Sequence, residues 1–110
     1  MHASPTALNK PILIFPAGMP RSLDYLERCK RDGQSVIGAS SLAYDVSKPA
    51  YPEWAFLPYV NDPGFLEALQ LLIAQRGIGG IYTPNPVVWS YLNEVLKDLQ
   101  PAIPLVNASP

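Results

Sequence analysis

The chain has very few residues that bind metals or act as nucleophiles, with one cysteine and one histidine in 110 residues. A single cysteine cannot form an intramolecular disulfide bond, and Cys29 with His2 falls short of the four ligands of a structural zinc site. Cys29 also lies within a helical pattern, where a buried and inert thiol is more common than a catalytic one. These absences disfavour disulfide frameworks, zinc modules and thiol-dependent catalysis.

Charged residues are also scarce, at 15% of the chain with a net charge of -1, whereas an average soluble domain has about 25%. The near-zero net charge removes the main electrostatic attraction to nucleic acids and anionic lipids. No apolar run approaches the roughly 20 residues of a membrane span, and the polar residues 1–10 lack the apolar region of a signal peptide. We therefore expect a flexible arm over residues 1–10, no nucleic-acid partner, no membrane partner and a cytoplasmic location.

Proline, by contrast, is abundant, with 13 residues. Pro20, Pro63 and Pro86 lie where helices are expected to begin, and the first turn of a helix tolerates a residue without an N–H group. The low charge has a separate interpretation, because a domain whose surface is partly covered by another domain exposes less of it to water. We therefore interpret the shortage of charge as a sign of a covered surface.

Apolar periodicity predicts short strands that alternate with helices. Short unbroken apolar runs ended by proline or glycine are typical of strands buried on both faces of a parallel sheet. Asp62 and Asn85, each followed by proline, indicate helix starts, and Gly33 and Gly77 indicate helix ends. The strands are expected over residues 11–15, 35–39, 54–59, 78–83 and 103–106, and the helices over residues 22–31, 62–77 and 85–100.

This alternation predicts an α/β fold, namely a single three-layer α/β/α Rossmann-like domain over residues 11–110. The sheet is expected to be open and mostly parallel, with four to five strands and helices on both faces. Residues 42–53 are aperiodic and interrupted by proline, so they predict an irregular connection.

In such a sheet, ligands bind beyond the carboxyl ends of the strands, where the strand order reverses. The loops at residues 16–22 and 83–86 are expected there, and each leads into a helix N-terminus that favours an anion. The candidate ligand-binding residues are Gly18, Met19, Arg21, Ser22, Ser40, Thr83 and Asn85. Simpler alternatives stay open: Gly18 as an ordinary turn residue, Arg21 as a solvated charge and Asn85 as a plain helix cap.

Known catalytic and nucleotide-binding signatures are missing from these loops. A dinucleotide-binding turn needs three glycines, but the first loop has Gly18 alone, and no Gly-Lys-Ser/Thr phosphate loop occurs. A phosphoacceptor site needs paired acidic residues after the first strand, whereas Asp45 and Asp62 are the only acidic residues near a strand end. We therefore expect no catalytic residues, no metal site and no cofactor in this chain.

Several stretches together resemble the N-terminal pre-ATP-grasp domain of carbamoyl-phosphate synthase large-subunit-like ligases. They are Ile12-Leu13-Ile14-Phe15 with Gly18 in the turn, Val36-Ile37-Gly38, Leu57-Pro58, Asp62 to Gly77 and Ile78 to Pro84. The resemblance covers nearly all of residues 11–110, and residues 104–110 resemble the last strand that leads into the linker of these enzymes.

The resemblance implies a division of labour between two domains. ATP, magnesium and the acyl-phosphate chemistry of a carboxylate-amine ligase would belong to a C-terminal ATP-grasp domain of the same polypeptide. The present domain would pack against that domain, form one wall of the substrate crevice and be inactive alone, and a homodimer is a further expectation. Two alternatives remain: a stand-alone module that binds a small anionic metabolite or nucleotide at helix N-termini, and an interaction domain without a ligand.

Overall fold

The computed structural model describes residues 10–110, so the expected arm over residues 1–10 and its His2 lie outside the described residues, apart from Lys10. The strands are β1 (Ile12–Ile14), β2 (Val36–Ser40), β3 (Trp54–Phe56) and β4 (Gly80–Tyr82), and the helices are α2 (Pro20–Asp32), α3 (Phe65–Arg76) and α4 (Pro86–Val95). Two short 3-10 turns, Lys48–Ala50 and Leu96–Asp98, lie in the connections. Within the described part of the chain, no helix combines the length and apolar character of a membrane span.

The four strands form one sheet in the order β3-β2-β1-β4. All three pairs of neighbouring strands are parallel, with Leu13 of β1 aligned to Ile37 of β2 and to Ile81 of β4. The predicted α/β class with an open parallel sheet is therefore confirmed. The strands are short because a glycine or proline follows closely on most of them, as Pro58 does on β3.

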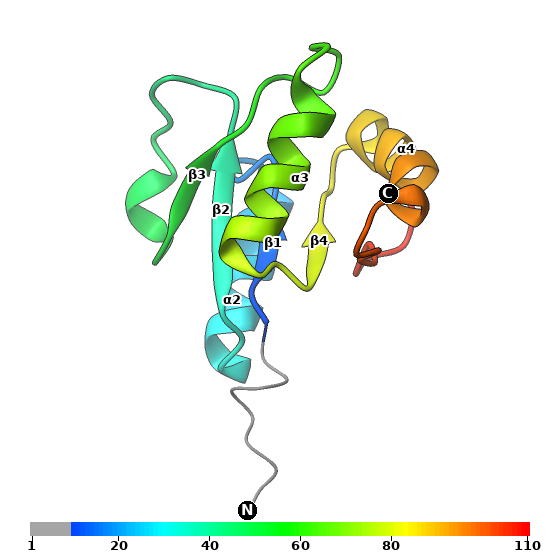
Figure 1. Cartoon of the computed structure of the whole chain (residues 1–110). Coiled ribbons are helices and arrows are strands. Elements are labelled where there is room, and N and C mark those ends of the chain that lie inside the picture. Colours follow the sequence, from blue (N-terminus) through cyan, green and yellow to red (C-terminus); the bar gives the residue numbers. More distant parts are fainter. Residues whose placement is uncertain (1–9) are drawn as a thin grey trace, which may run out of the picture.

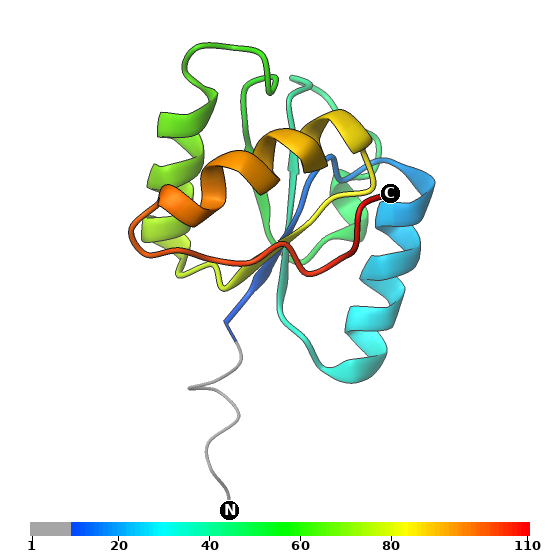
Figure 2. The same cartoon turned by 90° about the vertical axis from the view of Figure 1, so that its right-hand side faces the viewer.

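Helices cover both faces of the sheet, which gives three layers (Figures 1 and 2). Successive side chains of a strand point to opposite faces. Leu13 and Phe15 accordingly pack in the core under α3 and α4. Ile14 packs in the core under α2, where Tyr51 and Trp54 also lie with their rings 5.6 Å apart in an edge-on contact.

Most of the predicted helix signals are confirmed, but α2 begins two residues earlier than expected, and α4 ends at Val95, before a 3-10 turn, instead of at residue 100. Gly33 and Gly77 end α2 and α3 in the left-handed conformation, with φ of 72° and 63°. The Asn85 side chain caps α4. The start of α3 was wrong by three residues, because Asp62 forms a turn instead of a helix cap: its Oδ1 accepts from the Gly64 N–H at 2.7 Å, and the helix begins at Phe65,.

The strand expected over residues 103–106 is reduced to one bridge between Leu105 and Ile81. The Ile81 N–H donates to the Pro104 carbonyl at 3.0 Å, and the Val106 N–H donates to the Ile81 carbonyl at 2.9 Å. Pro104 has no N–H group with which to extend the ladder. The Asn107 side chain takes over this pairing, since it accepts from the Thr83 N–H at 3.2 Å and donates to the Thr83 carbonyl at 2.8 Å.

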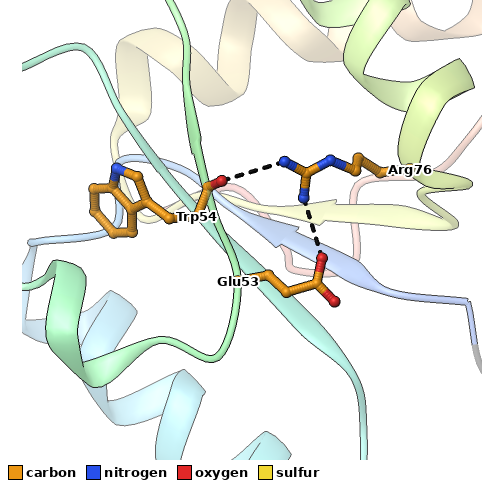
Figure 3. A network of polar contacts seen from close by, with 3 residues as sticks. All are labelled: Glu53, Trp54 and Arg76. Atoms are coloured by element: carbon orange, nitrogen blue, oxygen red, sulfur yellow. Dashed lines mark hydrogen bonds and ion pairs between the residues drawn. The ribbon is translucent and has the colours of Figure 1, made fainter.

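Arg76, in the last turn of α3, ties this helix to the edge strand β3 (Figure 3). Its Nη1 lies 3.1 Å from Glu53 Oε1, and its Nη2 donates to the Trp54 carbonyl at 3.4 Å. The ion pair is exposed, so it contributes about 0 to 1 kcal/mol. The contact at Trp54 covers part of an edge strand that would otherwise be open to pairing.

Candidate functional site

The strand order reverses between β1 and β4, since β2 and β3 lie on one side of β1 and β4 lies on the other. A crevice of about 880 Å³ opens beyond the carboxyl ends of the strands at this place. It is lined by residues within 15–20, 40–46, 59–61 and 85–88, which follow β1, β2, β3 and β4 in turn. The topology therefore places the crevice where parallel sheets bind their ligands.

The loop after β1 forms the floor of the crevice, and buried contacts hold it in place. The Ala17 N–H donates to the Ala39 carbonyl at 2.9 Å, and the Tyr51 hydroxyl donates to the Ala17 carbonyl at 2.7 Å. The Ser22 hydroxyl, 0% exposed, donates to the Pro16 carbonyl at 2.6 Å. Ser22 therefore fixes the loop and does not line the crevice.

Asp45, which follows β2, brings the only charged side chain among the described residues that line this crevice. A Cβ atom at Gly18 would lie 3.3 Å from Asp45 Oδ1 and 3.5 Å from its Oδ2, so glycine leaves room for the carboxylate. Asp45 Oδ1 accepts from the Ser47 N–H at 2.8 Å and from the Ser47 hydroxyl at 2.6 Å. The carboxylate is thus held against the loop after β1.

Two opposing effects set the pKa of Asp45. Partial burial alone would raise its pKa, but hydrogen bonds from Ser47 and Ser40 favour the charged form and lower the pKa below its usual range,. The usual pKa of an aspartate is about 3.9. Asp45 is therefore ionised at neutral pH.

The N-terminus of α4 has no N–H group left for a ligand. Asn85 Oδ1 accepts from the N–H groups of Val87 and Val88 at 2.9 and 3.1 Å, and Pro86 has no N–H. The Asn85 N–H itself donates to the Thr83 hydroxyl at 3.2 Å. Asn85 thus lines the crevice as a helix cap. The N-terminus of α2 differs, since Met19 gives it no side-chain cap.

Arg21 lies outside the crevice, in a second and more polar hollow of about 520 Å³ between α2 and the C-terminal segment. Tyr25 and Tyr82 stack there, with ring centroids 4.0 Å apart and planes 4° from parallel. Burial raises the pKa of Tyr25 to about 12. Burial also raises the pKa of the neighbouring Cys29 thiol, and Cys29 is buried as the helical pattern indicates.

The structure thus brings together four of the seven candidate residues. Gly18, Met19, Ser40 and Asn85 line the crevice. Arg21 lines the second hollow, and Ser22 and Thr83 are fully buried and line neither. Asp45 is the polar residue that the sequence reasoning missed: its place after a strand was noticed, but the aperiodic stretch around it gave no sign that it folds back onto Gly18.

The rim of the crevice is apolar and exposed. Five large aliphatic or aromatic side chains line the crevice and are exposed to solvent: Leu42, Tyr44, Val46, Tyr59 and Val87. Tyr44 and Val46 are the most exposed, at 80% and 81%. Exposed apolar side chains grouped at one crevice are typical of a surface that contacts a ligand or another domain.

The lining chemistry does not fit ATP with magnesium. Triphosphates are held by lysine, arginine or free N–H groups; no lysine or arginine of residues 10–110 lines the crevice, and of the two helix starts that line it only that of α2 lacks a side-chain cap. In the same described part of the chain, no three His, Cys, Asp or Glu side chains are grouped to hold a metal ion.

A comparison with known proteins gives no further guide to the function of the crevice, because no protein-family model and no curated protein matches the chain.

Proposed function

We propose that this chain is the non-catalytic N-terminal domain of an ATP-grasp ligase, where it forms one wall of the substrate crevice. In this proposal the ATP-grasp domain supplies ATP, magnesium and acyl-phosphate chemistry. The present domain packs its apolar rim against that partner and encloses the substrate between them. The observation that carries the proposal is the rim itself, because five large and exposed apolar or aromatic side chains line the crevice at the carboxyl edge of the sheet.

Two features disfavour a stand-alone module that binds anions at helix N-termini. At the start of α4, Asn85 already occupies the N–H groups, which leaves only the start of α2 without a side-chain cap. An anion in the crevice would also meet the ionised carboxylate of Asp45. An interaction domain that docks a partner and holds no ligand would share the apolar rim, so the experiment must include a measurement of substrate turnover.

The proposal expects the gene of this chain to encode an ATP-grasp domain as well. With that domain expressed separately, a V46E/V87E double variant is expected to weaken the association of the two domains by about tenfold or more, because two charges would enter an apolar interface. The ligase activity of the mixture should fall in parallel. Titration calorimetry measures the first effect, and release of ADP measures the second.

Leu71 provides the control, since it is an equally apolar side chain, 57% exposed on α3, that lies outside the crevice. An L71E variant is expected to leave association and activity unchanged. Equal losses in L71E and V46E/V87E would contradict the proposal, as would tight binding of ATP with magnesium to the 110-residue chain alone. Association without any turnover would favour the interaction domain.

A further inference from the structure

Asp45 is an ionised side chain without an ionic partner in an apolar crevice. Neither of the two ion pairs formed by residues 10–110 involves Asp45. A carboxylate has about four sites at which it can accept a hydrogen bond. The Ser47 N–H and the Ser47 hydroxyl both donate to Oδ1. These two donors leave accepting capacity on the carboxylate for a further donor.

The surroundings of Asp45 define what that donor must be. The other lining side chains are neutral, and the lining is mainly apolar. Tyr44 and Tyr59 add two exposed aromatic rings to the same crevice, and the face of such a ring attracts a cation,. A negative charge, two tyrosine rings and apolar walls are together complementary to a cation with an apolar body.

We propose that the crevice binds a small molecule that carries a protonated amine on an apolar body, with the Asp45 carboxylate as the counter-ion of the ammonium group. The volume of about 880 Å³ is within the range of small-molecule sites,. Ser47 positions the carboxylate by hydrogen bonding, and Gly18 leaves space for it. The inference concerns this chain alone, so it does not depend on the proposed ligase role.

The experiment uses 2-phenylethylammonium as the probe. Two compounds of similar shape are compared with it: the uncharged 2-phenylethanol and the negatively charged 3-phenylpropionate. Titration calorimetry on the whole chain gives the affinities, and amide chemical shifts locate the bound probe. We expect the ammonium to bind about tenfold or more tightly than the alcohol, because a charged hydrogen bond is worth about 1.5 to 3 kcal/mol. The carboxylate should bind more weakly still.

A D45N variant keeps the shape of the side chain and an acceptor for Ser47, but it removes the charge. It is expected to lose about tenfold or more of the affinity for the ammonium and to bind the alcohol as before. D24N is the matched control, since Asp24 carries the same charge on α2 but lines the second hollow. A D45N/S41K double variant, which replaces the negative charge of the crevice lining with a positive one, should reverse the preference in favour of 3-phenylpropionate.

Four outcomes would overturn the proposal. They are a tighter complex with 3-phenylpropionate, equal effects of D45N and D24N, shift changes outside the crevice, and no binding of the ammonium at millimolar concentration. A short peptide with one lysine provides the last comparison. If it bound more tightly than 2-phenylethylammonium, the crevice would belong to a lysine side chain of a partner protein and not to a small molecule.

Discussion

Gly38, in the middle of β2, lies against the ring of Tyr51. A Cβ atom at position 38 would come within 2.6 Å of two ring carbons, which is far below a van der Waals contact. We therefore expect G38A to displace the ring and to lower the free energy of unfolding by about 1 to 3 kcal/mol. Urea denaturation of the variant and the wild-type chain measures this difference.

A second background separates this clash from the ordinary preference of a strand for alanine over glycine. With Tyr51 replaced by alanine the ring is gone, so G38A should cost much less in a Y51A chain than in the wild type. The same cost in both backgrounds would show that the ring does not restrict position 38. Y51A itself is expected to be destabilising, because it also removes the hydrogen bond to the Ala17 carbonyl.

The roles of some glycines could be predicted from the sequence, and the roles of others could not. Gly33 and Gly77 follow helical patterns, so their role as helix ends could be predicted from neighbouring residues alone. Gly38 and Gly18 have roles that depend on Tyr51 and Asp45, which lie 13 and 27 positions later in the chain. Contacts of that kind arise from the folded chain, and no local pattern signals them.

Two pairs of residues, Asn85-Pro86 and Asp62-Pro63, look alike in the sequence but have different positions relative to their helices. Asn85 caps α4 directly by accepting from two N–H groups of its first turn. Asp62 accepts from Gly64 and lies in an exposed turn ahead of α3. The difference arises at the next residue: valine after Pro86 continues the helix, whereas Gly64 after Pro63 has a low helix propensity and becomes the N-cap itself,.

This difference predicts unequal costs for two matched substitutions. N85A should lower the free energy of unfolding by about 1 kcal/mol, because two N–H groups of α4 lose their acceptor. D62A should cost no more than about half of that, since its acceptor serves one exposed N–H outside the helix. Thermal or urea denaturation compares the two variants, and a D62A cost as large as that of N85A would place Asp62 back in the role of a helix cap.

The four strands of the sheet were predictable to within three residues, because a parallel sheet buries both faces and so selects unbroken apolar runs; the largest error is at β3, expected over 54–59 and observed over Trp54–Phe56. The segment at residues 103–106 has the same apolar character but fails to form a full strand. Its proline has no N–H group to donate, and its pairing depends on Ile81 of β4, which lies 24 positions before Leu105. Apolar character thus predicts where the segment packs, but the backbone N–H groups that it can donate determine whether it forms a full strand or a single bridge.

At the level of the whole molecule, the place of the crevice could be predicted from the sequence better than its chemistry could. Alternating strands and helices were enough to expect a crevice at the carboxyl edge, and Gly18 and Asn85 do line it. The anion expected there followed from helix N-termini treated in isolation. In the folded chain Asn85 occupies the donors of α4 and Asp45 adds a negative charge to the crevice, whereas the start of α2 keeps no side-chain cap.

The C-terminal segment closes the sheet through Asn107, whose side chain pairs with the backbone of Thr83 as a neighbouring strand would. In an N107A variant the Thr83 N–H loses its acceptor, and about 1 kcal/mol of net stabilisation is lost with each hydrogen bond. We expect amide hydrogen exchange at Thr83 to become about fivefold or more faster. Exchange followed by NMR reports on this single amide.

S109A serves as the control, since Ser109 lies in the same segment and lines the second hollow, whereas the pairing with Thr83 is made by Asn107. It should leave the exchange at Thr83 unchanged. Equal acceleration in both variants would mean that the segment is held by other contacts, such as the bond from the Trp89 indole N–H to the Asn107 carbonyl at 2.9 Å.

The Trp89 indole that makes this bond is also one of two fluorescent side chains that lie on opposite faces of the sheet. Trp89 and Trp54 are the only tryptophans of the chain. The fluorescence of Trp89 reports on the contact between α4 and the C-terminal segment, and that of Trp54 reports on the core under α2, on the opposite face of the sheet. The fluorescence of two single-tryptophan variants therefore follows the two outer layers independently, so that loosening of one layer on binding or unfolding can be told apart from loosening of the other.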